Sequence, residues 1–332
     1  MYMNKGFELA SRPQGLAREE NFRFFEREIG QPGPGQVLVR NLWLSLDPYM
    51  RGRMDESKSY AASQAIDAVM IGGTVGEVVI SNNEKFKVGD NVVGPGGWQL
   101  YSLTDGHMLN KVDGSKAPLQ AFVGPLGMPG VTAWIGLNRI ILPKASETVV
   151  ISAATGAVGT VVGQLAKAMG ARAVGIAGGP EKCKFAIDEL GFDACADHKA
   201  GDFAQQLKTA TPKGIDGLFE NVGGVPFKLC SHRLNDFARI AICGLIASYQ
   251  GEEKSSLDDL RIVLAKRVTI RGFIVADYAE ARPEALGNLV DLVSNGKLKW
   301  RETIAEGIEK APSAFLGMLK GKNFGKQLVK LS

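Results

Sequence analysis

The chain has 332 residues, of which 45% are hydrophobic and 22% are charged; these proportions are typical of globular proteins with one large or two ordinary domains, and they exclude global disorder. Its 39 Lys and Arg residues and 35 Asp and Glu residues leave a net charge of +4, too small an excess to indicate a nucleic-acid-binding protein. The four cysteines form no C-x-x-C pair and the N-terminus is polar, so we expect a reduced, cytoplasmic protein without a signal peptide.

The first third of the chain is predicted to be β structure. Alternating apolar and polar residues predict a strand over residues 36–46, and shorter strands are expected over residues 74–80 and 91–93. Short strands separated by Gly/Pro turns favour a barrel-like or sandwich domain.

From about residue 125 the pattern changes to alternating strands and helices. After a helix that starts in residues 130–137, we expect strands at 149–152, 171–176, 194–196, 217–220 and 239–243, and helices at 157–169, 182–190, 202–209 and 226–233. This order is typical of a parallel sheet covered by helices. Further strands are predicted at 268–275 and 327–331, and a helix at 282–294.

The stretch of residues 148–166 is uncharged and is nearly long enough to cross a bilayer. A glycine turn interrupts it, and the apolar pattern changes there from a β-branched run to helical spacing. We therefore interpret the stretch as a strand, a turn and a helix, and expect no membrane partner.

The turn in this stretch resembles a dinucleotide fingerprint with Ala in place of its first Gly, because it follows a strand and opens a helix. A side chain at Gly156 would block the approach of backbone N–H groups to a pyrophosphate, and Gly159 lets the helix pack closely on the strand. The predicted cofactor-binding residues are Ala154, Gly156, Ala157, Val158 and Gly159. A purely structural turn is the alternative.

The residues after the second strand indicate which dinucleotide is bound. An NAD site usually has Asp or Glu at the end of this strand, but here the strand leads into Gly178-Gly179-Pro180, with Glu181 as the only nearby acid. Lys182 follows at once, and a cation without the carboxylate favours the 2′-phosphate of NADP. A solvated lysine in the first helical turn is the other interpretation.

Motifs for other chemistries are absent from the sequence. It contains no H-E-x-x-H, no Cys/His cluster with zinc-ligand spacing, no phosphate-binding G-x-x-x-x-G-K-[ST] and no G-x-S-x-G. We therefore expect hydride transfer without a metal site.

Six segments in order along nearly the whole chain carry a family resemblance: 47–51 (DPYMR), 127–133 (GMPGVTA), 154–159 (ATGAVG), 220–224 (ENVGG), 239–244 (RIAICG) and 323–326 (NFGK). They resemble the zinc-independent medium-chain dehydrogenase/reductases, in particular the leukotriene B4 dehydrogenase/prostaglandin reductase type with its bacterial curcumin- and alkenal-reductase relatives. The zinc-dependent relatives carry metal ligands near DPYMR and near residues 72–76, which read GGTVG here.

The resemblance implies an α/β fold of two domains. Residues 1–125 and 303–332 would form a GroES-like, β-rich catalytic domain, and residues 126–302 a Rossmann-type, doubly wound parallel sheet that binds NADP. It also implies NADPH as the donor, with Lys182 on the 2′-phosphate and His198 where these reductases often have a tyrosine. Further contacts with the ribose and nicotinamide would come from Asn221, Asn323, Phe273, Val275, Met128 and Thr132.

The implied reaction is reduction of the C=C bond of α,β-unsaturated ketones and aldehydes. Negative charge develops on the carbonyl oxygen, so a hydrogen-bond donor is needed there. Tyr249 and the cofactor ribose hydroxyl are candidates and Tyr49 is another, although either tyrosine could only shape the pocket. Arg51 would bind an acidic substrate end or pair with a carboxylate.

Three alternatives remain for the whole protein. One is a quinone reductase of the same superfamily, and another is an NADPH- or RNA-binding protein without turnover, against which the small net charge argues. An alcohol dehydrogenase is disfavoured because the zinc ligands are absent. The resemblance also implies a homodimer, in which the strand over residues 268–275 pairs with its copy across a two-fold axis. A strand inside the sheet would show the same sequence pattern.

Overall fold

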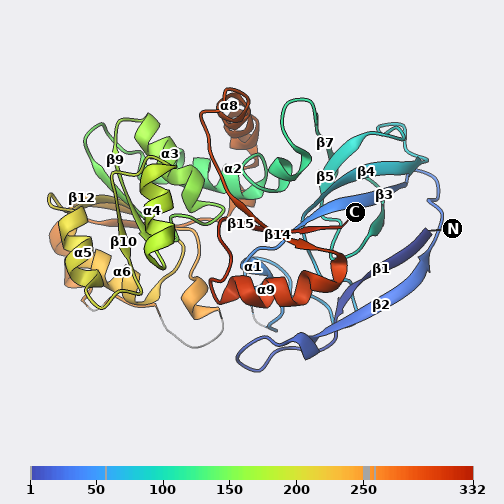
Figure 1. Ribbon diagram of the computed structural model, residues 1–332, viewed down its shortest axis with the longest axis horizontal. Helices are drawn as coiled ribbons and strands as arrows, with labels where there is room; N and C mark the ends of the chain where they lie inside the picture. Colours follow the sequence, from blue (N-terminus) through green and yellow to red (C-terminus); the bar gives the residue numbers. More distant parts are fainter. Residues whose placement is uncertain (1, 57, 250–254, 258, 332) are drawn as a thin grey trace. The chain divides into compact units, whose positions relative to one another are not determined.

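The computed structural model describes residues 2–331, except 57, 250–254 and 258. The chain divides into two compact units (Figure 1). The first combines Met1–Gly127 with Glu302–Ser332, and the second is Met128–Arg301.

The first unit is rich in β structure. Its two N-terminal strands, β1 and β2, form an antiparallel pair, and a seven-stranded sheet follows the order β14-β15-β3-β4-β5-β7, with β6 paired to β3. The strands are β1 (Tyr2–Leu9), β2 (Phe22–Ile29), β3 (Val37–Ser45), β4 (Thr74–Ser81), β5 (Asn91–Gly94), β6 (Tyr101–Thr104), β7 (Asn110–Lys111), β14 (Glu302–Glu306) and β15 (Lys326–Lys330), and the helices are α1 (Tyr49–Arg53) and α9 (Ala311–Leu319).

The core of this unit joins the two ends of the chain. The Trp98 ring stacks on Phe22 at 5.2 Å between centroids and meets the Phe315 ring of α9 edge-on at 5.4 Å. Strand β15 pairs antiparallel with β3, with Leu328 opposite Ser45. The C-terminal segment is therefore an integral part of the first unit.

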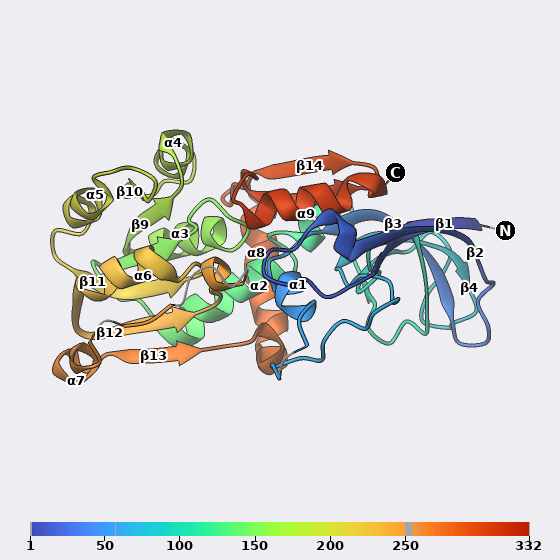
Figure 2. The same ribbon diagram turned by 90° about the horizontal axis from the view of Figure 1, so that it is seen from below.

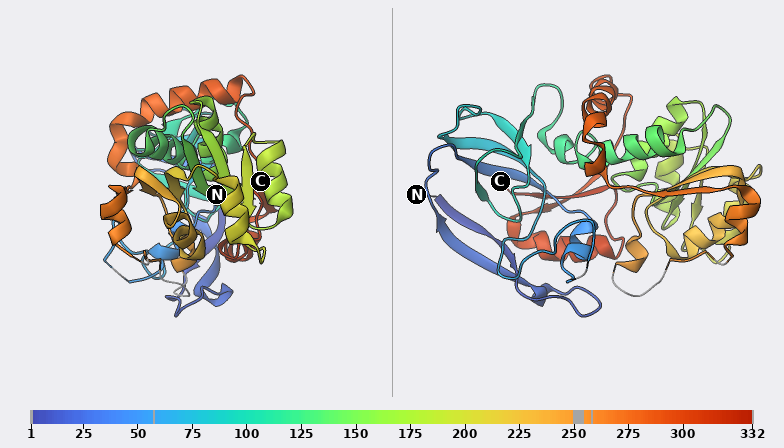
Figure 3. Two further views of the ribbon diagram at one scale, coloured as in Figure 1. Left: turned by 90° about the vertical axis from the view of Figure 1, so that its left-hand side faces the viewer. Right: turned by 180° about the vertical axis from the view of Figure 1, so that it is seen from behind.

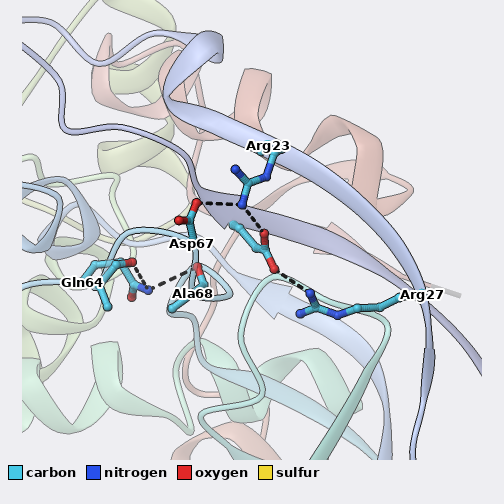
Figure 4. A network of polar contacts seen from close by, with 7 residues as sticks. Arg23, Arg27, Gln64, Asp67 and Ala68 are labelled. Atoms are coloured by element: carbon cyan, nitrogen blue, oxygen red, sulfur yellow. Dashed lines mark hydrogen bonds and ion pairs between the residues drawn. The ribbon is translucent and has the colours of Figure 1, made fainter.

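A buried carboxylate fixes the N-terminal strand pair. Glu8 on β1 accepts hydrogen bonds from Arg23 (2.7 Å) and Arg27 (2.8 Å) on β2. Arg23 also binds Asp67 at 2.8 Å, so that the loop carrying Asp67 is tied to the strands (Figure 4). Because the Glu8 side chain is only 6% exposed, two partners are needed to compensate for its desolvation.

The second unit is a six-stranded parallel sheet with the order β10-β9-β8-β11-β12-β13, and helices lie on both of its faces (Figures 2 and 3). Its strands are β8 (Thr148–Ser152), β9 (Arg172–Ala177), β10 (Ala194–Asp197), β11 (Ile215–Glu220), β12 (Leu234–Ile242) and β13 (Thr269–Gly272). Its helices are α2 (Met128–Ile135), α3 (Gly159–Ala168), α4 (Pro180–Asp188), α5 (Phe203–Ala210), α6 (Gly224–Ser231), α7 (Arg261–Lys266) and α8 (Arg282–Ser294).

Most predicted elements of this unit are present, with two differences at its ends. Helix α2 continues as a π-helical stretch, Gly136–Ile141, and stops where Leu142 adopts a left-handed conformation with φ of 50°. The strand predicted over residues 268–275 is shorter, because the chain leaves the sheet after Gly272 and the Phe273 side chain turns into the core. Residues 148–166 divide between β8 and α3, and no helix among the described residues is long and apolar enough to cross a membrane.

Candidate functional site

The strand order of the second unit places a ligand site at the carboxyl ends of its strands. Chain order reverses between β8 and β11, and dinucleotides bind outside the carboxyl ends at such a switch point. Ser152 ends β8, and its hydroxyl donates to Glu220, the last residue of β11, at 2.7 Å. The Asn221 amide donates to the Ser152 carbonyl at 2.8 Å. These bonds hold Asn221 at the switch point.

Glu220 also holds the residues that follow β11 in place. Its carboxylate is fully buried and also accepts the backbone N–H groups of Val222 (2.6 Å) and Gly223 (2.8 Å). Burial raises the pKa of Glu220. This residue was not predicted to have a role, because an acid at a strand end shows its function only when its partners on the neighbouring strand are known.

The predicted glycine turn leaves its backbone open to the close approach of another group. Ala153 has a left-handed φ of 49°, and Gly156 N–H donates to its carbonyl at 2.8 Å. A Cβ on Gly159 would lie 2.3 Å from the Ala153 carbonyl oxygen, so only glycine fits there. Helix α3 begins at Gly159, and its N-cap residue, Val158, makes no side-chain hydrogen bond to it. The partial positive charge at the N-terminus of a helix fits an anionic pyrophosphate.

Basic side chains gather beside this turn, beyond the end of β9. Lys182 lies in the first turn of α4, and burial together with Lys199 lowers its pKa. Burial and Lys199 also lower the pKa of His198. A Cβ on Gly178 would lie 2.8 Å from His198 Nε2 and 3.0 Å from Lys199 Cε, so both side chains lie over that glycine. A phosphate here would relieve the repulsion among the three groups.

Lys199 is a candidate that the sequence analysis missed. Its only signal was its place directly after His198 at the end of a predicted strand. We call the site of Lys182, His198 and Lys199 the basic corner. Asp197 holds its segments together, because its carboxylate accepts Gly179 N–H at 2.7 Å and Lys199 N–H at 2.9 Å.

A cavity of about 380 Å³ lies at the carboxyl ends of β12 and β13, and Tyr249 and Phe273 both line it. The Leu245 N–H donates to the Tyr249 hydroxyl at 3.3 Å, and the Ile246 N–H donates to the Asn221 carbonyl at 3.2 Å. The loop that carries Tyr249 is thereby fixed to the end of β11. Val275 begins the next helical turn and is not in the cavity wall, where Ile274 lies instead.

Packing fixes the Phe273 ring. It meets the Phe219 ring edge-on with 6.2 Å between centroids, and a Cβ on Gly136 would lie 2.9 Å from its tip. Met128 and Thr132 lie on the first turns of α2, where the Thr132 hydroxyl donates to the Met128 carbonyl at 2.8 Å.

The first unit contains the remaining candidates. Tyr49 begins α1, and burial together with the Asp47 charge raises the pKa of its hydroxyl. The Asp47 carboxylate binds the Lys326 ammonium at 3.0 Å. The Asn323 amide donates to the Gly325 carbonyl at 2.7 Å. The ion pair between Asp47 and Lys326 thus connects residues 47–51, which include Tyr49, with residues 323–326, which include Asn323.

Arg51 is a structural residue in this arrangement. Its side chain is buried and binds Asp55 at 2.7 Å and the Gly15 carbonyl at 2.7 Å. Of the two roles considered from the sequence, pairing with a carboxylate is therefore the one observed. Among the described residues, no three His, Cys, Asp or Glu side chains are grouped so that they could hold a metal ion.

Comparisons with known proteins cover nearly the whole chain. Two family models match, one described as an N-terminal domain of oxidoreductase over residues 5–112 and one as a zinc-binding dehydrogenase over residues 157–295. The chain is 47% identical to an NADPH-dependent curcumin reductase of Escherichia coli (strain K12), over 99% of this chain and 97% of that one. It is 39% identical to prostaglandin reductase 1 of Rattus norvegicus, over 99% and 100% of the two chains. The chain belongs to the medium-chain dehydrogenase/reductases.

A solved structure agrees with this assignment. The crystal structure of CurA in complex with NADPH from Vibrio vulnificus matches with a TM-score of 0.94 and 45% identity over 99% of both chains. The predicted family, the zinc-independent curcumin and alkenal reductase type, and the predicted fold class are therefore confirmed.

Proposed function

We propose that this reductase transfers a hydride from NADPH to the β-carbon of α,β-unsaturated ketones and aldehydes and thereby reduces their C=C bond. The cofactor and the class of enzyme, an oxidoreductase acting on C=C bonds, agree with relatives described as NADPH-dependent curcumin reductase and 2-alkenal reductase. The observation that carries the proposal for this chain is the glycine turn, with the basic corner on one side and the cavity of Tyr249 and Phe273 on the other.

Different residues of the chain bind different parts of NADPH. Ala154, Gly156, Ala157, Val158 and Gly159 form the turn whose backbone N–H groups bind the pyrophosphate. Lys182, His198 and Lys199 bind the 2′-phosphate. Asn221 and Phe273 position the nicotinamide half, to which we also assign Asn323, Val275, Met128 and Thr132.

NADPH, when bound, supplies the hydride. The chain must then stabilise the negative charge on the carbonyl oxygen of the substrate. Tyr249 is the first candidate, because its hydroxyl accepts the Leu245 N–H at 3.3 Å and a hydroxyl that accepts one hydrogen bond becomes a better donor. Tyr49 is the second candidate, because its hydroxyl is a hydrogen-bond donor at neutral pH, although its raised pKa makes it a weaker donor than an ordinary tyrosine.

The decisive test gives purified protein NADPH together with a panel of enones and enals, and quinones in parallel. We expect NADPH oxidation with the enones and enals, and a product in which the C=C bond is saturated while the carbonyl is intact. Faster turnover of quinones would favour the quinone reductase. Absence of oxidation with both classes would favour a binding protein without turnover.

Tyr249→Phe tests the proposed donor. Removing one hydrogen bond to a developing oxyanion lowers kcat by about 10²-fold, whereas NADPH affinity is expected to stay nearly unchanged. Stopped-flow hydride transfer and an NADPH fluorescence titration measure the two quantities. Tyr49→Phe is the matched comparison, and equal losses of rate and affinity in Tyr249→Phe would remove the proposed role.

Lys182→Ala tests the basic corner. Loss of one charge-assisted bond costs about 1.5–3 kcal/mol, or roughly a 10- to 100-fold weaker NADPH affinity, while NADH, which lacks the 2′-phosphate, is expected to bind as before. Lys184→Ala is the control, because Lys184 is exposed on the same helix and pairs with Asp188. An unchanged ratio of NADPH to NADH affinity would refute the assignment.

We also propose a homodimer. Strand β13 is the edge of the parallel sheet and all four of its residues are exposed, so it could pair with its copy across a two-fold axis. Light scattering would show the mass. The cytoplasmic location and the lack of a nucleic-acid partner stay predictions from the sequence.

A further inference from the structure

Two cysteines that the proposed reaction does not use lie in contact. The Cys195 thiol, on β10, donates a hydrogen bond to the sulfur of Cys183, in the first turn of α4, with 3.2 Å between the sulfur atoms. Both are free thiols. Cys183 is 8% exposed and Cys195 is partly exposed, whereas Cys230 is fully buried. The pair is therefore less deeply buried than Cys230.

The two thiols differ in acidity. The hydrogen bond from Cys195 lowers the pKa of Cys183, whereas the same contact and burial raise the pKa of Cys195. Cys183 also lies at the N-terminus of a nine-residue helix, where a thiolate is stabilised. Such a pair combines a nucleophile with a second, resolving thiol.

The pair joins the segments that form the basic corner. Lys182 directly precedes Cys183, and His198 lies three residues after Cys195. Asp197 connects the same segments through Gly179 at 2.7 Å. A covalent link between the thiols would therefore change the position of Lys182 relative to His198.

We propose that Cys183 and Cys195 form an oxidative modification site, at which a hydroperoxide produces a disulfide that weakens NADPH binding. The effect on NADPH rests on the proposed function, but the formation of the disulfide does not. The Cys183 thiolate attacks the peroxide O–O bond and becomes a sulfenic acid, releasing hydroxide with hydrogen peroxide. Cys195 then attacks the Cys183 sulfur. Overall, two thiols and one hydrogen peroxide yield one disulfide and two waters.

The shortening that accompanies formation of the disulfide explains why NADPH binding would become weaker. A disulfide has a sulfur–sulfur distance of about 2.05 Å, roughly 1 Å less than the 3.2 Å observed between the thiols. Where rotation of the side chains does not supply the whole change, the first turn of α4 and the end of β10 move toward each other. Charge-assisted hydrogen bonds to phosphate are short and directional, so displacement of Lys182 weakens them.

The test treats the full-length, reduced protein with hydrogen peroxide. We expect an intact mass lower by two hydrogens, a peptide that links Cys183 to Cys195, and an NADPH dissociation constant raised at least about fivefold. A dithiol reductant should reverse all three changes, and NADH affinity should change less. Sulfinic acid without a disulfide would overturn the site, and a disulfide with unchanged NADPH affinity would overturn its effect.

Three variants make the test specific. Cys195→Ser should form no disulfide and lose the response of NADPH affinity to peroxide, and Cys183→Ser should do the same. Cys230→Ser should keep the response, with Cys230→Ala as a second control should the hydroxyl destabilise the core. If the reduced protein bound no NADPH at all, the proposed function would fail while the mass measurement still decided on the disulfide.

Discussion

Gly159→Ala is expected to weaken NADPH binding at least about tenfold and to destabilise the second unit by about 1–3 kcal/mol, the usual cost of overpacking. The new methyl carbon would lie 2.3 Å from the Ala153 carbonyl oxygen and 2.9 Å from the Ala154 Cα. Both are backbone atoms of the turn itself, so that relief requires the turn to move. The backbone N–H groups that approach the pyrophosphate would move with it.

A second glycine of the same helix separates the two effects. A Cβ on Gly163 would lie 1.9 Å from the tip of the Phe192 ring, which is a side chain and not part of the backbone of the turn. Gly163→Ala should therefore lose stability in urea unfolding while NADPH affinity stays close to that of the unaltered protein. If Gly159→Ala bound NADPH as tightly as Gly163→Ala, the turn would not be the pyrophosphate site.

Local patterns were sufficient to predict the strand–turn–helix and the basic residue beyond it. The glycine turn lies within six residues, and the strand before it and the helix after it have distinct periods. Lys182 was proposed because it follows the same βα unit. These features depend on short stretches of chain, and the sequence shows them directly.

Features that depend on distant partners were not predictable in the same way. The contact of Cys183 with Cys195 joins a helix to a strand, and the position of Lys199 over Gly178 depends on pairing of β10 with β9. The strand predicted over residues 268–275 stops early because Phe273 packs against Phe219. Tertiary packing decides such details, whereas β-propensity alone favours continuation of the strand.

The second large effect is expected from Lys326→Met. The Lys326 ammonium donates to the Leu46 carbonyl at 2.6 Å and pairs with Asp47 at 3.0 Å, and the two side chains are 3% and 8% exposed. Removing the ammonium leaves a buried carboxylate without its counter-ion, which costs about 3–5 kcal/mol. Urea unfolding followed by tryptophan fluorescence, to which buried Trp98 of the first unit contributes, measures the loss.

A double variant distinguishes an unpaired charge from lost packing. In Lys326→Met/Asp47→Leu neither charge remains buried, so stability should return toward that of the unaltered protein even though two polar contacts have gone. Lys330→Met, on the same strand but partly exposed, should change little. Because the pair connects the segments of Tyr49 and Asn323, we expect the single variant to lose turnover as well. If the double variant were as unstable as Lys326→Met, then packing around the lysine stem would matter more than its charge.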